Sequence, residues 1–71
     1  MNRIPVSSSN LASVGYDAER RVLEVGFRNG TVYQYFNVPN SVYVGLMAAG
    51  SHGRYFDANV KKAGYRYQQV G

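Results

Sequence analysis

The pattern of apolar and polar positions is clearest in the middle of the chain, where it predicts a β-hairpin. Large apolar residues alternate with smaller or polar ones over 21–27, which is the period of a strand. Asn29-Gly30 follows, a pair typical of a tight turn between two strands. Residues 31–36 are rich in β-branched and aromatic side chains and predict the returning strand.

The length of the hairpin loop decides which way two central tyrosines point. A two-residue loop pairs Phe27 with Val32 and turns Tyr33 and Tyr35 away from the large apolar residues of 23–27. Their rings then form an exposed pair, a layout similar to that of sheet-surface RNA binders. A three-residue loop over 28–30, with a glycine bulge, pairs Phe27 with Thr31 and brings both rings onto the apolar face. We favour this second register because it gathers five large side chains on one face, which a small sheet needs to hold its helices.

Weaker strand and loop signals precede the hairpin. Residues 11–16 are predicted as a first strand with Ala12, Val14 and Tyr16 on one face, and residues 17–20 as the turn that follows it. Residues 1–10 are polar, contain Pro5 and a run of serines, and are predicted to be an irregular arm.

The second half of the chain is predicted to be helical. A first helix begins at Pro39 or Asn40 and ends at Gly50 as a left-handed cap. Ser51 is the expected N-cap of a second helix, which Gly64 closes. The apolar stripes at helical spacing are Val42, Tyr43, Leu46, Met47 and Ala49 in the first helix, and Tyr55, Phe56, Asn59, Val60 and Ala63 in the second. The tail over 65–68 alternates tyrosine with polar residues, so it either adds a short edge strand or packs on the helices.

These elements predict an α+β fold. A three-stranded antiparallel meander is followed by two helices packed on one face (β-β-β-α-α), with a short C-terminal strand as an addition, and residues 11–71 form one domain. A chain of 71 residues buries only about 60% of its unfolded surface, so nearly every apolar residue is needed in the core. An open sheet edge of this kind suits a monomer or a weak homodimer.

The amino-acid composition limits the kinds of covalent and metal cross-link and the compartments that we expect for this protein. The chain has no cysteine and one histidine, which excludes disulfides and makes a structural zinc site improbable. The absence of cysteine fits a reducing cytoplasm. No apolar run approaches the ~20 residues of a membrane span, and the N-terminus lacks the apolar region of a signal peptide.

Charge and tyrosine content point to a polyanion as partner. Eight Lys+Arg residues against four Asp+Glu residues give a net charge of +4, and the chain has seven tyrosines. Four basic residues and two tyrosines lie on the second helix and the tail, and would form a phosphate track with stacking rings if they share a surface. These candidate RNA- or anion-binding residues are Arg54, Lys61, Lys62, Arg66, Tyr65 and Tyr67. The alternative is a solvated helix face with tyrosines lying over the core.

Catalytic chemistry finds no support in the sequence. Ser51 and His52 are adjacent, and adjacent side chains rarely aim at each other, whereas an activated serine needs its base within hydrogen-bond reach. The acidic residues form no metal-like cluster. The segment 51–54 could present amides to an anion, but tight packing at Gly53 explains it more simply. We therefore expect a binding module without a cofactor rather than an enzyme, with a protein partner docked at a sheet edge or aromatic patch as the second possibility.

An ordered set of motifs carries a family resemblance. It comprises Val6-x-Ser8-Ser9-Asn10-Leu11, Val14-Gly15-Tyr16-Asp17, Leu23-x-Val25-x-Phe27-x-x-Gly30, Val32-Tyr33-x-Tyr35, Val38-Pro39 and Ala49-x-Ser51-x-Gly53-x-Tyr55-Phe56. Together, over Val6 to Tyr67, they resemble the KTSC domain, named for a C-terminal extension of lysyl-tRNA synthetase.

The resemblance implies a domain that occurs alone in bacteria and phages and is also appended to some lysyl-tRNA synthetases. It implies family motif positions at Tyr33, Tyr35, Ser51, Gly53, Tyr55 and Phe56. RNA binding is suggested only by the synthetase context. The family often has Ile-Arg where this chain has Val60-Lys61, and lysine lacks the bidentate fork of arginine.

Overall fold

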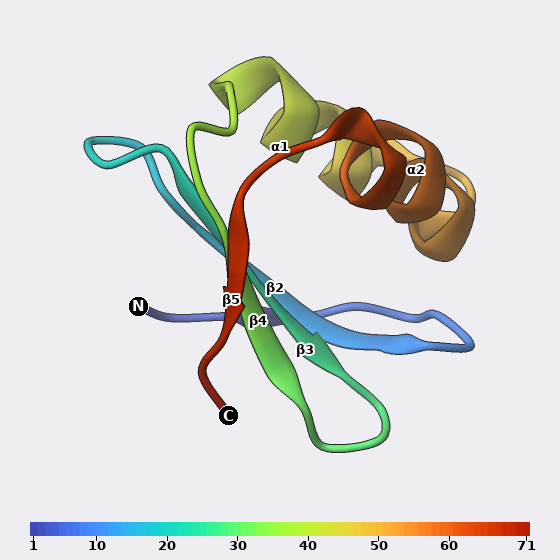
Figure 1. Cartoon of the computed structure of the whole chain (residues 1–71). Coiled ribbons are helices and arrows are strands. Elements are labelled where there is room, and N and C mark those ends of the chain that lie inside the picture. Colours follow the sequence, from blue (N-terminus) through green and yellow to red (C-terminus); the bar gives the residue numbers. More distant parts are fainter.

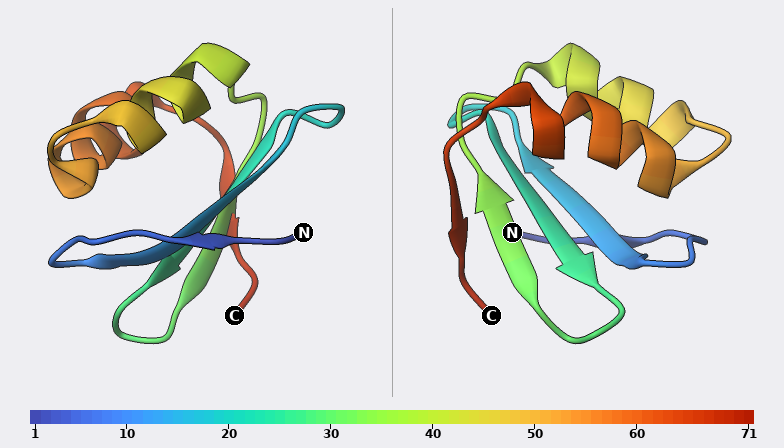
Figure 2. Two further views of the ribbon diagram at one scale, coloured as in Figure 1. Left: turned by 180° about the vertical axis from the view of Figure 1, so that it is seen from behind. Right: turned by 45° about the vertical axis from the view of Figure 1, so that its right-hand side comes forward.

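A twisted antiparallel sheet carries two helices on one face (Figure 1). The computed structural model describes all 71 residues. Its five strands lie in the order β1-β2-β3-β4-β5. The elements are β1 (Ile4–Pro5), β2 (Leu11–Asp17), β3 (Val22–Phe27), β4 (Val32–Tyr35), α1 (Asn40–Ala48), α2 (His52–Asn59), the 3-10 helix η1 (Lys61–Ala63) and β5 (Tyr67–Gln69). Both helices and η1 lie between β4 and β5 in the chain, and β5 returns beside β4 (Figure 2). No helix is long and apolar enough to span a membrane.

The favoured hairpin register is confirmed. Val25 pairs with Tyr33 and Leu23 with Tyr35, and the backbone N–H of Phe27 donates to the carbonyl of Thr31 at 2.8 Å. Gly30 adopts φ 93°, which a glycine accepts at no steric cost. Tyr35 is therefore buried, at 6% exposure, on the same face as the apolar residues of β3.

The number of strands was wrong in the sequence prediction, which placed three where the sheet has five. Ile4 and Pro5, inside the predicted irregular arm, pair with Val14 and Ser13 of β2. Proline is tolerated there because β1 is an edge strand. At the other edge the tail forms β5 against β4, as the sequence had allowed. Neither segment shows an apolar alternation, because both are exposed along their whole length.

The face assignment in the first strand was right for Val14 and Tyr16 and wrong for Ala12. Leu11 pairs with Phe27, but Ser13 pairs with Gly26, so Ala12 is the extra residue of a β-bulge. The bulge turns Leu11 onto the core face together with Val14, and both are fully buried. Strict alternation through Ala12 misses this reversal.

The core lies between the inner face of the sheet and the helices. Strands β2–β4 contribute five of its nine residues, and the rest come from the loop before α1, from α1 and from the end of α2. Its members are Leu11, Val14, Leu23, Val25, Tyr35, Val38, Leu46, Phe56 and Val60. Asn59 and Ala63, which the sequence placed in the second buried stripe, are exposed. The reason is that α2 ends at Asn59, and the chain then tightens into η1, which carries Lys61 and Lys62, before Gly64 reverses it at φ 88°.

The junction between the helices confirms one predicted cap and corrects another. The Oγ atom of Ser51 accepts the backbone N–H of Arg54 at 3.3 Å and so caps α2. Gly50 is not left-handed, since only Gly30 and Gly64 among the glycines have positive φ. Instead, the ring of His52 satisfies the Leu46 carbonyl at the end of α1, with 2.8 Å between Nδ1 and O. A carbonyl only accepts, so Nδ1 carries the proton.

The outer face of the sheet is covered by one arginine from the N-terminal segment. Nη1 of Arg3 lies 2.6 Å from Oε2 of Glu24, and Nε donates to Ser13 at 2.8 Å. The amide of Gln34 donates to the other Glu24 oxygen at 2.8 Å. The Gln34 hydrogen bond, followed by the bond and charge of Arg3, lowers the pKa of Glu24 below its ordinary value of 4.5, even though burial acts in the opposite direction. This cluster is what anchors β1 to the sheet.

Candidate functional site

An aromatic cleft opens between the sheet and α2. Its volume is about 490 Å³, within the range of ligand sites, and five of its ten lining residues are hydrophobic. The rings come from β3 (Phe27), β4 (Tyr33 and Tyr35), α2 (Phe56) and β5 (Tyr67). The hairpin register places the first three on one face, and the return of the chain as β5 adds the last. We call this site the tyrosine cleft.

The rings of the tyrosine cleft pack against one another in a graded series from core to surface. Phe56 contacts Phe27 and Tyr35 edge to face, with centroids 5.5 Å apart in both pairs. Tyr67 lies over Tyr33 and Tyr35 at 6.0 and 5.7 Å. Burial, and to a lesser extent the neighbouring Tyr33 and Tyr67 hydroxyls, raise the pKa of Tyr35, so its hydroxyl stays protonated at neutral pH. Tyr67 is 65% exposed and is the most exposed ring of the cleft.

The rim of the cleft is polar and carries one cation without an ionic partner. The polar lining residues are Asn10, Asn29, Thr31, Asp57 and Lys61. Asp57 is engaged by Lys62, with 3.0 Å between the charged atoms. Lys61 forms no ion pair and is exposed. The two charged lining residues therefore cancel, and Lys62, which pairs with Asp57 from outside the lining, adds one positive charge beside the rim.

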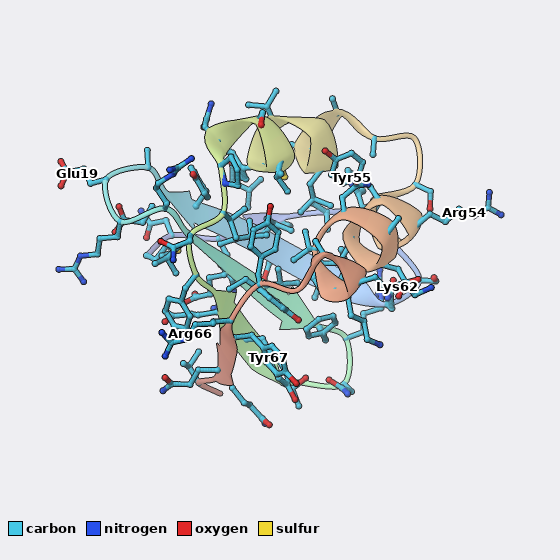
Figure 3. The ribbon with its side chains drawn as sticks, turned by 45° about the horizontal axis from the view of Figure 1, so that its top comes forward. Glu19, Arg54, Tyr55, Lys62, Arg66 and Tyr67 are labelled. Atoms are coloured by element: carbon cyan, nitrogen blue, oxygen red, sulfur yellow. The ribbon has the colours of Figure 1, made fainter.

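The basic and tyrosine residues singled out from the sequence do not form a single surface. Lys61 and Tyr67 line the tyrosine cleft. Arg54 and Arg66 lie on opposite sides of the molecule (Figure 3). Lys62 is paired with Asp57, and Tyr65 is half-buried against the core. The chain reverses at Gly64, so the short sequence distance between these residues does not place them together.

The family motif positions divide into cleft residues and structural residues. Tyr33, Tyr35 and Phe56 line the cleft. Ser51 caps α2, as described above. Gly53 and Tyr55 secure close contacts: a Cβ at residue 53 would lie 2.6 Å from Oδ1 of Asn10, and the Tyr55 ring lies against Gly45 of α1.

Sequence reasoning missed two kinds of lining residue. Phe27 was assigned to the core, and Asn10 and Asn29 to a motif and a turn, yet all three face the cleft. The one available signal was that Asn29 occurs in the loop next to β3 and β4, which carry three of the rings; Asn10 precedes β2, which carries none. Their meeting with α2 is a long-range contact that no local pattern encodes.

Comparison with known proteins decides the family. A model of the KTSC domain matches residues 7–67. The chain belongs to the KTSC family. A crystal structure of a KTSC domain protein from Yersinia pestis is 43% identical and superposes with a TM-score of 0.90, covering 99% of this chain and 97% of that one. The KTSC match begins after β1, so Arg3 and β1 both lie outside it.

Two sequence relatives show the settings of this KTSC domain. An uncharacterised protein of Stutzerimonas stutzeri is 43% identical over 70 residues, 99% of each chain. A lysine–tRNA ligase of Nostoc punctiforme is 32% identical over 62 residues, which is 87% of this chain but 11% of the ligase. The same unit thus has relatives both of its own length and inside a much longer protein.

Proposed function

We propose that this KTSC domain is a non-catalytic binding module that holds single-stranded RNA in the tyrosine cleft. One observation carries the proposal: an exposed tyrosine, Tyr67, and an unpaired lysine, Lys61, line the same ring-lined cleft. Single-stranded nucleic acid is commonly held by an aromatic face for the base and a cation for the phosphate.

In this mechanism an aromatic ring binds the base and a lysine binds the phosphate. A base stacks on Tyr67, behind which Tyr33 and Tyr35 form a packed support that holds the ring in place. Stacking of this kind contributes about 1–3 kcal/mol per base. The ammonium of Lys61 contacts the adjoining phosphate and displaces a counterion, while the net charge of +4 favours the encounter.

The lysine–tRNA ligase relative supports the proposal by context. In that protein a related segment belongs to a lysine–tRNA ligase, an enzyme that acts on tRNA. A tRNA-charging activity does not extend to this chain, which aligns with only 11% of the ligase. RNA contact is the property that a domain of this size would share with it.

The test is an NMR titration of labelled protein with a short single-stranded RNA at low and moderate salt. We expect shifts at Tyr33, Tyr67 and Lys61 that weaken as salt rises. Tyr67→Ala should lower affinity by about 1–3 kcal/mol, roughly 5- to 150-fold. Lys61→Gln should reduce the slope of log affinity against log salt by about 0.7.

The matched control reverses a charge outside the cleft. Arg54→Glu changes the net charge as much as Lys61→Glu does, but Arg54 is not one of the lining residues. If both reversals weaken binding equally, the interaction is a non-specific effect of net charge. If no peak moves at low salt, RNA is not the ligand.

The open edge of β5 favours a second candidate, a protein partner. β5 is the last strand of the sheet, and Tyr67 and Val70 beside it are 65% and 44% exposed. An extended peptide could pair with this edge and place a side chain on Tyr67. Shifts confined to β5 in a peptide titration, unaffected by salt, would favour this candidate over RNA.

A further inference from the structure

The carboxamide of Asn10 is held in one orientation by Ser8. Oγ of Ser8 accepts the backbone N–H groups of Asn10 and Leu11 at 3.4 and 3.3 Å. Its single proton is therefore free to be donated, and the side-chain atom of Asn10 that receives it at 3.1 Å is an acceptor. That atom is Oδ1, so the amino group Nδ2 is the end that remains unpaired.

Asn29 is oriented in the same way by Thr31 on the hairpin loop. Oδ1 of Asn29 accepts both the backbone N–H of Thr31 at 3.1 Å and its hydroxyl at 2.7 Å. The Nδ2 group of Asn29 makes no hydrogen bond within the protein. Two separate loops thus present the same arrangement, a carbonyl engaged by a hydroxyl and an amino group left free.

The two asparagines belong to one site, the tyrosine cleft. Asn10 and Asn29 line it. The backbone N–H of Arg28, next to Asn29, donates to the backbone carbonyl of Asn10 at 2.9 Å, which ties the two loops together. Gly53 lets the side chain of Asn10 lie directly against α2, since a Cβ there would be 2.6 Å from Oδ1. The rim thus holds two carboxamide amino groups and the ammonium of Lys61 as donors, while the carboxylate of Asp57, 3.0 Å from Nζ of Lys62, is its charged acceptor.

We infer that this rim selects a base with carbonyl oxygens, uracil above all, and discriminates against adenine. Uracil presents two carbonyl acceptors to the fixed amino groups. Asparagine recognises adenine by donating to a ring nitrogen and accepting from the exocyclic amine at once. Oδ1 of Asn29 already accepts two hydrogen bonds, and Oδ1 of Asn10 accepts one and is packed against Gly53 of α2, so that bidentate contact is not open to them. The inference rests on the proposed function and names the base class of the same cleft.

The experiment compares oligouridylate with oligoadenylate of equal length by NMR titration of the 71-residue chain. One hydrogen bond gained or lost changes affinity by roughly 2- to 12-fold, so wild-type protein should prefer oligouridylate by at least that factor. Repeating the titration with uridine and adenosine monophosphates removes any effect of base stacking within the adenylate strand.

The variants test the donors through the ratio of the two affinities. Asn10→Asp keeps the acceptor that faces Ser8 and replaces the amino group with a carboxylate oxygen. We expect the uracil preference to fall towards one, with both affinities lowered by the added charge. Asn40→Asp makes the same charge change at the first residue of α1, outside the cleft, and should leave the ratio unchanged.

A second variant keeps the inference testable if Asn10→Asp perturbs the loop. Thr31→Val retains the side-chain shape but removes the shorter of the two hydrogen bonds that orient Asn29, so the amide is held less firmly and adenine affinity should rise relative to uracil. Equal binding of both RNAs by the wild type, or a ratio unaffected by Asn10→Asp and Thr31→Val, overturns the inference while the proposed function stands. If neither RNA shifts the cleft residues, both are overturned.

Discussion

The contact between α1 and α2 offers a sharp test of the packing, because the Tyr55 ring occupies the space that a side-chain methyl group at Gly45 would need. A Cβ on residue 45 would lie 2.6 Å from Cζ and 3.0 Å from Cε2 of Tyr55, and the hydroxyl would be closer still. These atoms belong to a rigid ring, so Gly45→Ala must either push the helices apart or rotate Tyr55 out of its site. Family motif position Tyr55 therefore acts by packing across the helix pair.

The expected change in the free energy of unfolding for Gly45→Ala follows from two opposing effects. Overpacking of a tight contact costs about 1–3 kcal/mol. Replacing glycine by alanine in a helix interior stabilises by about 1 kcal/mol. Gly45→Ala should therefore destabilise the wild type by about 1 kcal/mol, which is a fall in Tm of about 4–8 °C for a domain of this size. In a Tyr55→Leu background the ring atoms are gone, and the same change should stabilise by about 1 kcal/mol.

Urea unfolding of the four proteins, followed by circular dichroism, measures this cycle. The coupling free energy between positions 45 and 55 should be about 2 kcal/mol, well above the error of the method. A Gly45→Ala effect of the same sign and size in both backgrounds would refute the reasoning, since it would mean that the Tyr55 ring has room for the extra methyl group.

Two further predictions concern the supports of the fold and the cleft. Glu24→Gln should destabilise by about 1–3 kcal/mol at pH 7, because it weakens charged hydrogen bonds from Arg3 and Gln34. The folded state lowers the pKa of Glu24, so this stabilisation is complete above pH 4.5 and is lost as pH falls through the folded pKa. Urea unfolding across that range should show the free energies of unfolding of variant and wild type converging as the pH falls. Gly53→Ala should displace Asn10 and abolish the uracil preference, with amide shifts at 8–11 that a Gly50→Ala control, in open space, does not produce.

The hairpin was predictable from the sequence because local geometry and burial agree there. The loop Arg28-Asn29-Gly30 supplies a glycine where a positive φ is needed, and the resulting register alone gathers the large side chains on one face. A one-residue slip would have exposed Tyr35, which is buried instead. The cap at Ser51 was predictable for the same reason, since it depends on residues three apart.

The bulge, the edge strands and the phosphate track depended on contacts that no local pattern contains. Ala12 leaves no mark in the sequence that distinguishes a bulge from regular alternation. β1 pairs with β2 next to the contact of Arg3 with Glu24, which joins residues 21 positions apart. The basic residues after residue 53 are close in sequence, but α2 ends at Asn59 and Gly64 turns the chain, so Arg54 and Arg66 point apart.

The tyrosine cleft shows how motif residues that lie far apart in the sequence can contribute to one site. The rings come from the hairpin and β5, but the donors at the rim come from loops whose side chains are oriented by their own hydroxyl neighbours, Ser8 and Thr31. Gly53 joins these parts, because it allows α2 to lie against Asn10 while Phe56, one turn further along, supports the rings. A change at any of these positions would alter the shape or the polarity of the same cleft. The residues near 8–10, 33–35 and 51–56 therefore depend on one another physically, although they are separate in the sequence.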